Sequence, residues 1–104
     1  METKTFSALA EPTRFKIVGL LMTQPRSVNQ VASLLGIRQP QASKHLATLY
    51  EAGLVSNYPV AQQRIYALNP EPFTQMEVWL GEIRRSWGER LQRLDGYLET
   101  LTKG

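Results

Sequence analysis

The chain has 104 residues, of which 42% are hydrophobic and 20% charged, with a net charge of +3 and no cysteine. This length fits one domain, and the lack of cysteine excludes disulfides and thiolate-based metal or redox sites. No stretch is apolar enough to cross a membrane, and residues 1–10 lack the basic-then-apolar pattern of a secretion signal. We therefore expect a cytoplasmic protein.

Residues 27–53 predict two short helices joined by a turn. Ser27 can cap the first helix, and Gly36 can end it in the left-handed conformation. Pro40 is suited to the first turn of the second helix, which we expect to run to about Ala52. The apolar stripe of the first helix comprises Val28, Val31, Ala32, Leu34 and Leu35. The pattern is that of a helix-turn-helix.

The second helix has an apolar and a polar face. Helical spacing places Ala42, His45 or Leu46, Leu49 and Ala52 on the inner side. The outer side then carries Gln39, Gln41, Ser43, Lys44 and Thr48. Glutamine can read adenine edges and lysine can reach guanine or phosphate, so this face suits DNA. An ordinary helical hairpin within a core is the alternative.

The next segment predicts a β-hairpin. Residues 54–58 and 64–68 are rich in β-branched and aromatic side chains, and residues 59–63 separate them as a loop. A helix-turn-helix followed by a hairpin is a winged helix, so the predicted fold class is mainly α (α+β winged helix). Arg64 enters the second strand beside the polar tip, where it can reach a phosphate or the minor groove.

Four ordered motifs resemble the ArsR family of winged-helix repressors: ALAEPTR at 8–14, IRQPQASKHL at 37–46, LYEAGLV at 49–55 and RIYAL at 64–68. The resemblance covers nearly the whole chain. It implies a homodimeric transcriptional repressor that binds double-stranded DNA at a palindromic operator. The resemblance and the polar outer side of the second helix together indicate which residues contact DNA: Arg38, Gln39, Gln41, Ser43, Lys44, His45, Thr48, Gln63 and Arg64.

The chain departs from the family pattern at three places. Metal-sensing members use Cys-x-Cys pairs or clustered His and carboxylate ligands, whereas this chain has no cysteine and one histidine, so we expect no metal site and no cofactor. Arg38 and Gln41 stand where Ser or Thr and a small residue are common, which predicts a weaker helix cap. Pro59 and residues 62–63 replace the usual Gly-rich basic tip.

The basic charge is concentrated on the predicted winged helix. Residues 12–69 contain six Arg and Lys against Glu51 alone, whereas residues from 70 onward contain five basic and six acidic side chains. A polyanion would be attracted to the first segment, and binding should weaken with salt. An acidic face would have favoured a protein partner.

The terminal segments predict a dimer interface. A helix over about 71–102 would span about 45 Å and expose a long apolar stripe on a monomer, which a second copy can cover. The opening helix contributes to the same interface, while residues 14–22 form a buried helix through Phe15, Ile17, Val18, Leu20 and Leu21. The predicted interface residues are Phe6, Leu9, Met76, Trp79, Leu80, Ile83, Trp87, Leu91, Leu94 and Leu98.

We therefore expect a single domain over residues 1–104, with a DNA-binding core at about 12–69 and dimerisation helices at about 1–11 and 70–104. An enzyme is not expected, because His45 is the one histidine and no phosphate loop occurs. The alternative is a winged-helix module that binds a protein or a small molecule without binding DNA. An organic ligand, a protein effector and control by concentration remain open as the regulatory signal.

Overall fold

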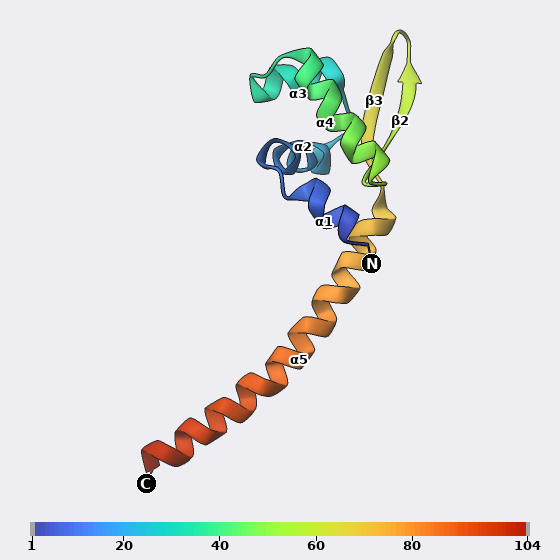
Figure 1. Cartoon of the computed structure of the whole chain (residues 1–104). Helices are drawn as coiled ribbons and strands as arrows, with labels where there is room; N and C mark the ends of the chain where they lie inside the picture. The colour runs from blue at the N-terminus through green and yellow to red at the C-terminus, as the bar shows by residue number, and fades with distance from the viewer. Residues whose placement is uncertain (1, 104) are drawn as a thin grey trace. The chain divides into compact units, whose positions relative to one another are not determined.

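The computed structural model describes residues 2–103 and contains five helices, three strands and two compact units, one ending at Phe73 and one beginning at Thr74. Figure 1 shows the elements in chain order. They are α1 (Thr3–Leu9), α2 (Pro12–Thr23), β1 (Arg26–Ser27), α3 (Val28–Leu35), α4 (Gln39–Glu51), β2 (Val55–Val60), β3 (Gln63–Leu68) and α5 (Pro70–Lys103).

Local signals set the starts and ends of α2 and α3. The Glu11 carboxylate accepts a hydrogen bond from the Arg14 backbone N–H at 2.8 Å, and Pro12 occupies the first turn of α2. Ser27 and Gln30 form a reciprocal capping box at the start of α3. Gly36 ends α3 with φ 65°, a left-handed conformation that glycine adopts without steric cost. The predicted cap and stop of this helix are both confirmed.

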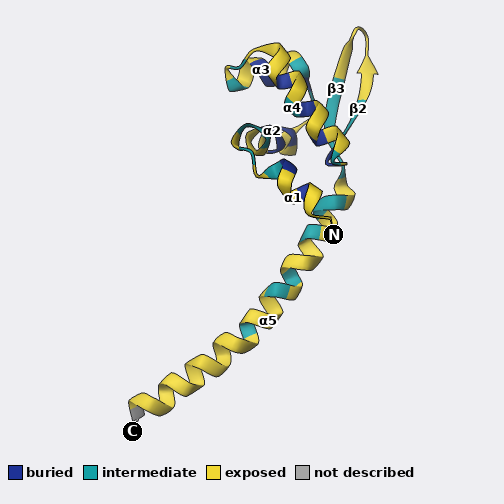
Figure 2. Cartoon of the chain, in the orientation of Figure 1, coloured by how far each residue is buried: buried dark blue, intermediate teal, exposed yellow. Residues whose placement is uncertain are grey.

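The core of the first unit lies between α2, α3, α4 and the base of the hairpin (Figure 2). Helices α2, α3 and α4 each contribute one buried stripe, α1 contributes Ala8, and Leu54 and Val55 add two side chains at the start of β2. The buried apolar residues are Ala8, Ile17, Val18, Leu21, Val31, Ala32, Ala42, Leu46, Leu49, Leu54 and Val55. The winged-helix architecture predicted from the sequence is confirmed.

Two residues predicted to be buried are exposed. Phe15 is 66% exposed and Leu34 is 54% exposed. At about 100° per residue, each lies about 110° from the centre of its helix's buried stripe. Their predicted burial is wrong, because only one face of each helix packs against the core and both side chains lie off that face.

The sheet has three antiparallel strands in the order β1-β3-β2. The hairpin is longer than predicted, because Val60 pairs with Gln63 and the loop is reduced to Ala61 and Gln62. Pro59 lies within β2 rather than in the loop, which is possible because β2 is an edge strand with one unpaired side. The short strand β1 was not predicted, since two residues give no periodicity.

The second unit consists of most of α5, whose predicted range of about 71–102 is confirmed. Met76 and Ile83 are half-buried. Apolar side chains three or four residues apart follow one face, and most are exposed: Leu80, Trp87, Leu91, Leu94, Leu98 and Leu101. No helix within residues 2–103 has the length and apolar character needed to cross a bilayer.

Ala61 adopts φ 55° at the first position of the hairpin loop, where an L side chain is strained. We expect Ala61→Gly to raise the free energy of unfolding by about 0.5 to 1 kcal/mol, because glycine removes the steric cost at some cost in chain entropy. Urea unfolding measures the change. Gln62→Gly is the control and should not stabilise the protein, since Ala61 is the one non-glycine residue with positive φ in the described chain. An Ala61→Gly variant no more stable than the parent would contradict this account.

Candidate nucleic-acid interface

Helix α4 buries one face and presents the other to solvent. Ala42, Leu46 and Leu49 have no exposed surface. The side chains predicted for the outer face are all exposed: Gln39, Gln41, Ser43, Lys44 and Thr48. The helix therefore projects amides, hydroxyls and one ammonium group from a rigid, packed support.

The start of α4 lacks the usual side-chain cap. Arg38 occupies the N-cap position, and its guanidinium group has no acceptor to offer the orphan N–H groups. Gln41 Oε1 instead accepts a hydrogen bond from the Arg38 backbone N–H at 3.3 Å. This hydrogen bond holds the Gln41 carboxamide through its oxygen atom and leaves its NH₂ group available as a donor.

Arg64 is held on the outer part of the hairpin. Its Nη1 atom donates a hydrogen bond to Asn57 Oδ1 at 2.9 Å, across the β2–β3 pair. Arg64 and the neighbouring Gln63 are exposed. The contact with Asn57 limits the positions of the guanidinium group while leaving other N–H donors on the same group.

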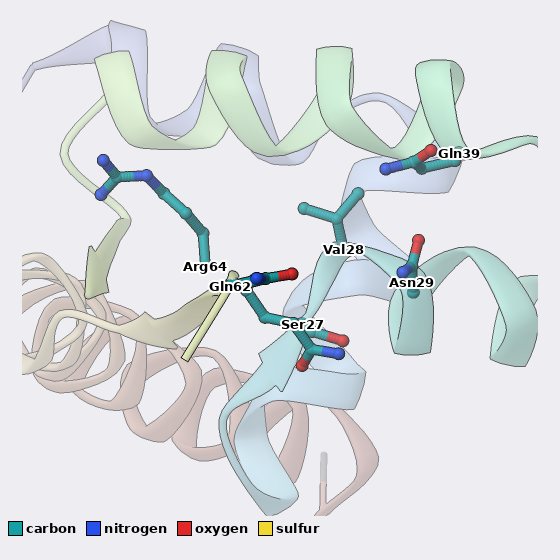
Figure 3. A pocket seen from close by; sticks show the side chains of 7 residues that line it. Ser27, Val28, Asn29, Gln39, Gln62 and Arg64 are labelled. Atoms are coloured by element: carbon teal, nitrogen blue, oxygen red, sulfur yellow. The ribbon is translucent and has the colours of Figure 1, made fainter. Parts of the chain in front are cut away.

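Pairing of β1 with β3 brings the start of α3 next to the hairpin. Ser27 lies opposite Ile65 in this register. The result is an open pocket of about 230 Å³, lined by residues 27–29, by Gln39 at the start of α4 and by residues 62–64 (Figure 3). Asn29 and Gln62 were not predicted as site residues. They come together through the pairing of β1 with β3, and a strand of two residues leaves no pattern in the sequence.

His45 differs from the other candidates on α4. Its Nδ1 atom lies 3.8 Å from Glu11 Oε2, and both side chains are partly buried. Glu11 is the N-cap of α2, so His45 contacts the neighbouring helix start. The Arg14 backbone N–H, with a smaller effect of His45, lowers the pKa of Glu11 below its ordinary value of 4.5.

Five of the seven basic residues of the first unit fall into two groups. Arg14 Nε donates to the Ala8 carbonyl at 2.7 Å, and Arg26 donates to the Leu20 carbonyl and to Thr23 Oγ1. The guanidinium groups of these two residues are thus hydrogen-bonded within the protein, to the end of α1 and to α2. Three others lie on α4, at its N-cap or on the hairpin: Arg38, Lys44 and Arg64. Three of the five exposed cations of this unit therefore lie on α4, at its N-cap or on the hairpin, and the other two, Lys4 and Lys16, lie on α1 and α2.

Comparisons with known proteins agree with this geometry. Residues 11–57 match the family described as bacterial regulatory protein, arsR family. The chain is 31% identical over 98 residues to the HTH-type transcriptional regulator Rv2034 of Mycobacterium tuberculosis, covering 94% of this chain and 86% of that protein. It is also 31% identical over 75 residues to the transcriptional repressor SdpR of Bacillus subtilis, covering 72% of this chain and 83% of that protein.

A solved structure has the same fold. The homodimeric winged helix-turn-helix DNA-binding domain Mb0332 of Mycobacterium bovis matches with a TM-score of 0.67 at 24% identity, covering 85% of this chain and 82% of that chain. The match supports the assignment of α3 and α4 as the helix-turn-helix and of β2 and β3 as the wing.

The contact of Glu11 with the start of α2 predicts a pH-dependent stability difference. Because the folded-state pKa of Glu11 is lowered, its contribution is present above pH 4.5 and is lost as the pH falls through the folded-state pKa. Glu11→Gln should therefore be less stable than the parent at neutral pH, with the gap closing in acid. Thermal or urea unfolding across this pH range measures it, and a gap independent of pH would contradict the assignment.

Proposed function

The chain belongs to the arsR family of bacterial regulatory proteins, and we propose that it is a homodimeric transcriptional repressor that binds double-stranded DNA at an inverted repeat. We also propose that it acts in the cytoplasm by binding alone, without a catalytic step. The observation that carries the proposal is the exposed polar face of α4 opposite a fully buried apolar face.

The exposed face of α4 suits the major groove. An α-helix fits this groove, and carboxamide side chains there can pair with adenine edges. We assign Gln39, Gln41 and Ser43 mainly to bases. Arg38 and Thr48 flank this group and are candidates for the groove edge. His45 contacts Glu11, and we therefore assign it to the packing of α4 against α2 rather than to DNA.

Lys44 and the hairpin residues have a different role in the proposal. Lys44 is a point charge on the outer face of α4, and Arg64 is held on the hairpin by Asn57. Both are suited to phosphate or groove-edge contact, with Gln63 beside Arg64. Such contacts position the protein on DNA and supply the salt-dependent part of the affinity.

Dimerisation is supported by the apolar face of α5. Trp87, Leu91 and Leu94 are each at least half exposed in a single chain, and Leu98, one turn further along, is 48% exposed. Continuous apolar surface of this length marks an interface, and a second copy of the same helix can cover it. Trp79 widens this face. Phe6 and Leu9 of α1 remain predicted interface residues.

The function is tested by comparing Arg64→Ala with Gln41→Ala on an operator duplex and a scrambled duplex at two salt concentrations. Removal of the Arg64 cation should lower affinity for both duplexes and flatten the salt dependence by about one unit of slope. Removal of the Gln41 amide should cost roughly 1 to 3 kcal/mol on the operator and relax specificity, with the salt slope unchanged.

Fluorescence anisotropy with operator fragments selected from genomic DNA provides the measurement. Gln92→Ala, on the opposite side of α5 from its apolar face, serves as the control and should bind like the parent. If both test variants bind the operator like the parent, α4 and the hairpin do not contact DNA. If the parent shows no salt-dependent binding, the chain is not a DNA-binding repressor.

The dimer is tested by placing charges on the apolar face of α5. Ile83→Glu together with Leu94→Glu should give monomers in sedimentation velocity, because a buried unpaired carboxylate at each position opposes association. Tight operator binding should be lost with the dimer. Gln92→Glu together with Thr100→Glu adds the same charge elsewhere on α5 and should leave the dimer intact. A dimeric Ile83→Glu/Leu94→Glu protein would refute the interface.

A further inference from the structure

We propose that the pocket between α3, α4 and the hairpin seats the sugar-phosphate backbone of one DNA strand, held by the uncharged carboxamides of Asn29, Gln39 and Gln62. This inference rests on the proposed function and adds a contact to the same complex. It gives a DNA-binding role to Asn29 and Gln62, which lie outside the exposed face of α4.

The lining of the pocket is rich in carboxamide groups. Four carboxamide side chains line the pocket: Asn29, Gln39, Gln62 and Gln63. In Figure 3 the Arg64 side chain extends from the hairpin toward α4, whereas the labelled carboxamides of Gln39, Asn29 and Gln62 come from α4, α3 and the hairpin loop. Asn and Gln side chains are regular donors to phosphate oxygens in protein–DNA complexes. The pocket is thus lined by neutral donors beside one cation.

Some polar groups of the pocket are already hydrogen-bonded within the protein, and others are not. The Ser27 hydroxyl accepts from the Gln30 N–H, and the Ser27 N–H donates to Gln30 Oε1. Arg64 Nη1 is bonded to Asn57. Within residues 2–103, the carboxamides of Asn29, Gln39 and Gln62 make no side-chain hydrogen bond, and all three are exposed. Their NH₂ groups are therefore available to donate to a ligand in this pocket, together with the remaining N–H groups of Arg64.

The pocket lies between the start of α4 and the hairpin loop. In the proposed complex α4 enters the major groove and the hairpin tip lies over the adjacent minor groove. The wall between these two grooves is the sugar-phosphate backbone of one strand. Gln39 belongs to the start of α4 and Gln62 to the hairpin loop, so the pocket between them faces that strand.

Phosphate contacts from neutral amides differ from those of cations in how they affect the salt dependence of DNA binding. They add hydrogen bonds to a charged acceptor, which makes each contact stronger than one between neutral groups. They release no counterion, because the protein gains no cation at the phosphate. The carboxamides should therefore raise affinity for every DNA sequence while leaving the salt slope unchanged, in contrast to Arg64.

Asn29→Asp tests the inference with almost no change in side-chain shape. Asn29 occupies the second position of α3, where an acidic side chain is favoured by the helix dipole, so the variant should be at least as stable as the parent. In the pocket the new carboxylate meets phosphate without a donor. We expect affinity to fall at least about tenfold on both operator and scrambled duplexes.

Gln30→Glu is the matched control. It adds the same charge at the next residue of α3, outside this pocket, and keeps the capping box with Ser27. We expect it to weaken binding much less than Asn29→Asp. Asn29→Ala completes the set: it should weaken binding to both duplexes with the salt slope of the parent.

The outcomes separate this inference from the proposed function. If the parent binds the operator but Asn29→Asp binds like Gln30→Glu, the pocket does not seat the backbone and the repressor assignment stands. A loss with Asn29→Ala that is confined to the operator would show base reading and would also overturn the inference. If the parent binds neither duplex, both proposals fail. Thermal unfolding of each variant shows that the loss is not a folding defect.

Discussion

The architecture depends on the burial of one face of α4. Ala42, Leu46 and Leu49 have no solvent-exposed surface, and α4 packs against α3, α2 and β2. Burial of two leucine side chains stabilises the fold by roughly 3 to 6 kcal/mol in transfer free energy, which is large beside the net stability of a small domain. Because a helix has fixed periodicity, burying this face also determines which side chains face solvent. The core and the candidate DNA-binding face are therefore two sides of one helix.

The three-stranded sheet adds a second constraint. Two residues, Arg26 and Ser27, pair with β3, and this short contact joins the start of α3 to the hairpin. Strand β3 also contacts α2 and α3, and β2 contacts α4, but the pairing with β1 is the contact that places Ser27 beside the hairpin. With it, the pocket that contains Asn29 and Gln62 has a defined shape. Residues that are far apart in the sequence, at the start of α3 and in the hairpin, thus line one pocket.

Much of the fold could be predicted from the sequence because its signals are local. Ser27 and Gly36 bound α3 through a cap and a left-handed stop, and the apolar spacing of α4 identified its buried face. The errors arise where burial depends on tertiary contacts. Phe15 and Leu34 are apolar yet lie off the packed stripe, and β1 is too short to produce a pattern. The contact of His45 with Glu11 and the pocket beside Asn29 likewise join residues whose proximity comes from the packed fold.

The central claim is that two copies place α4 in successive major grooves on one side of a DNA duplex. Hydroxyl-radical footprinting of the protein on a selected operator tests it most directly. The account predicts two protected half-sites related by an inverted repeat, with centres roughly 34 to 36 Å apart or at a multiple of that distance, on the same face of the helix. A single protected half-site at saturating protein, or half-sites on opposite faces of the duplex, would contradict it.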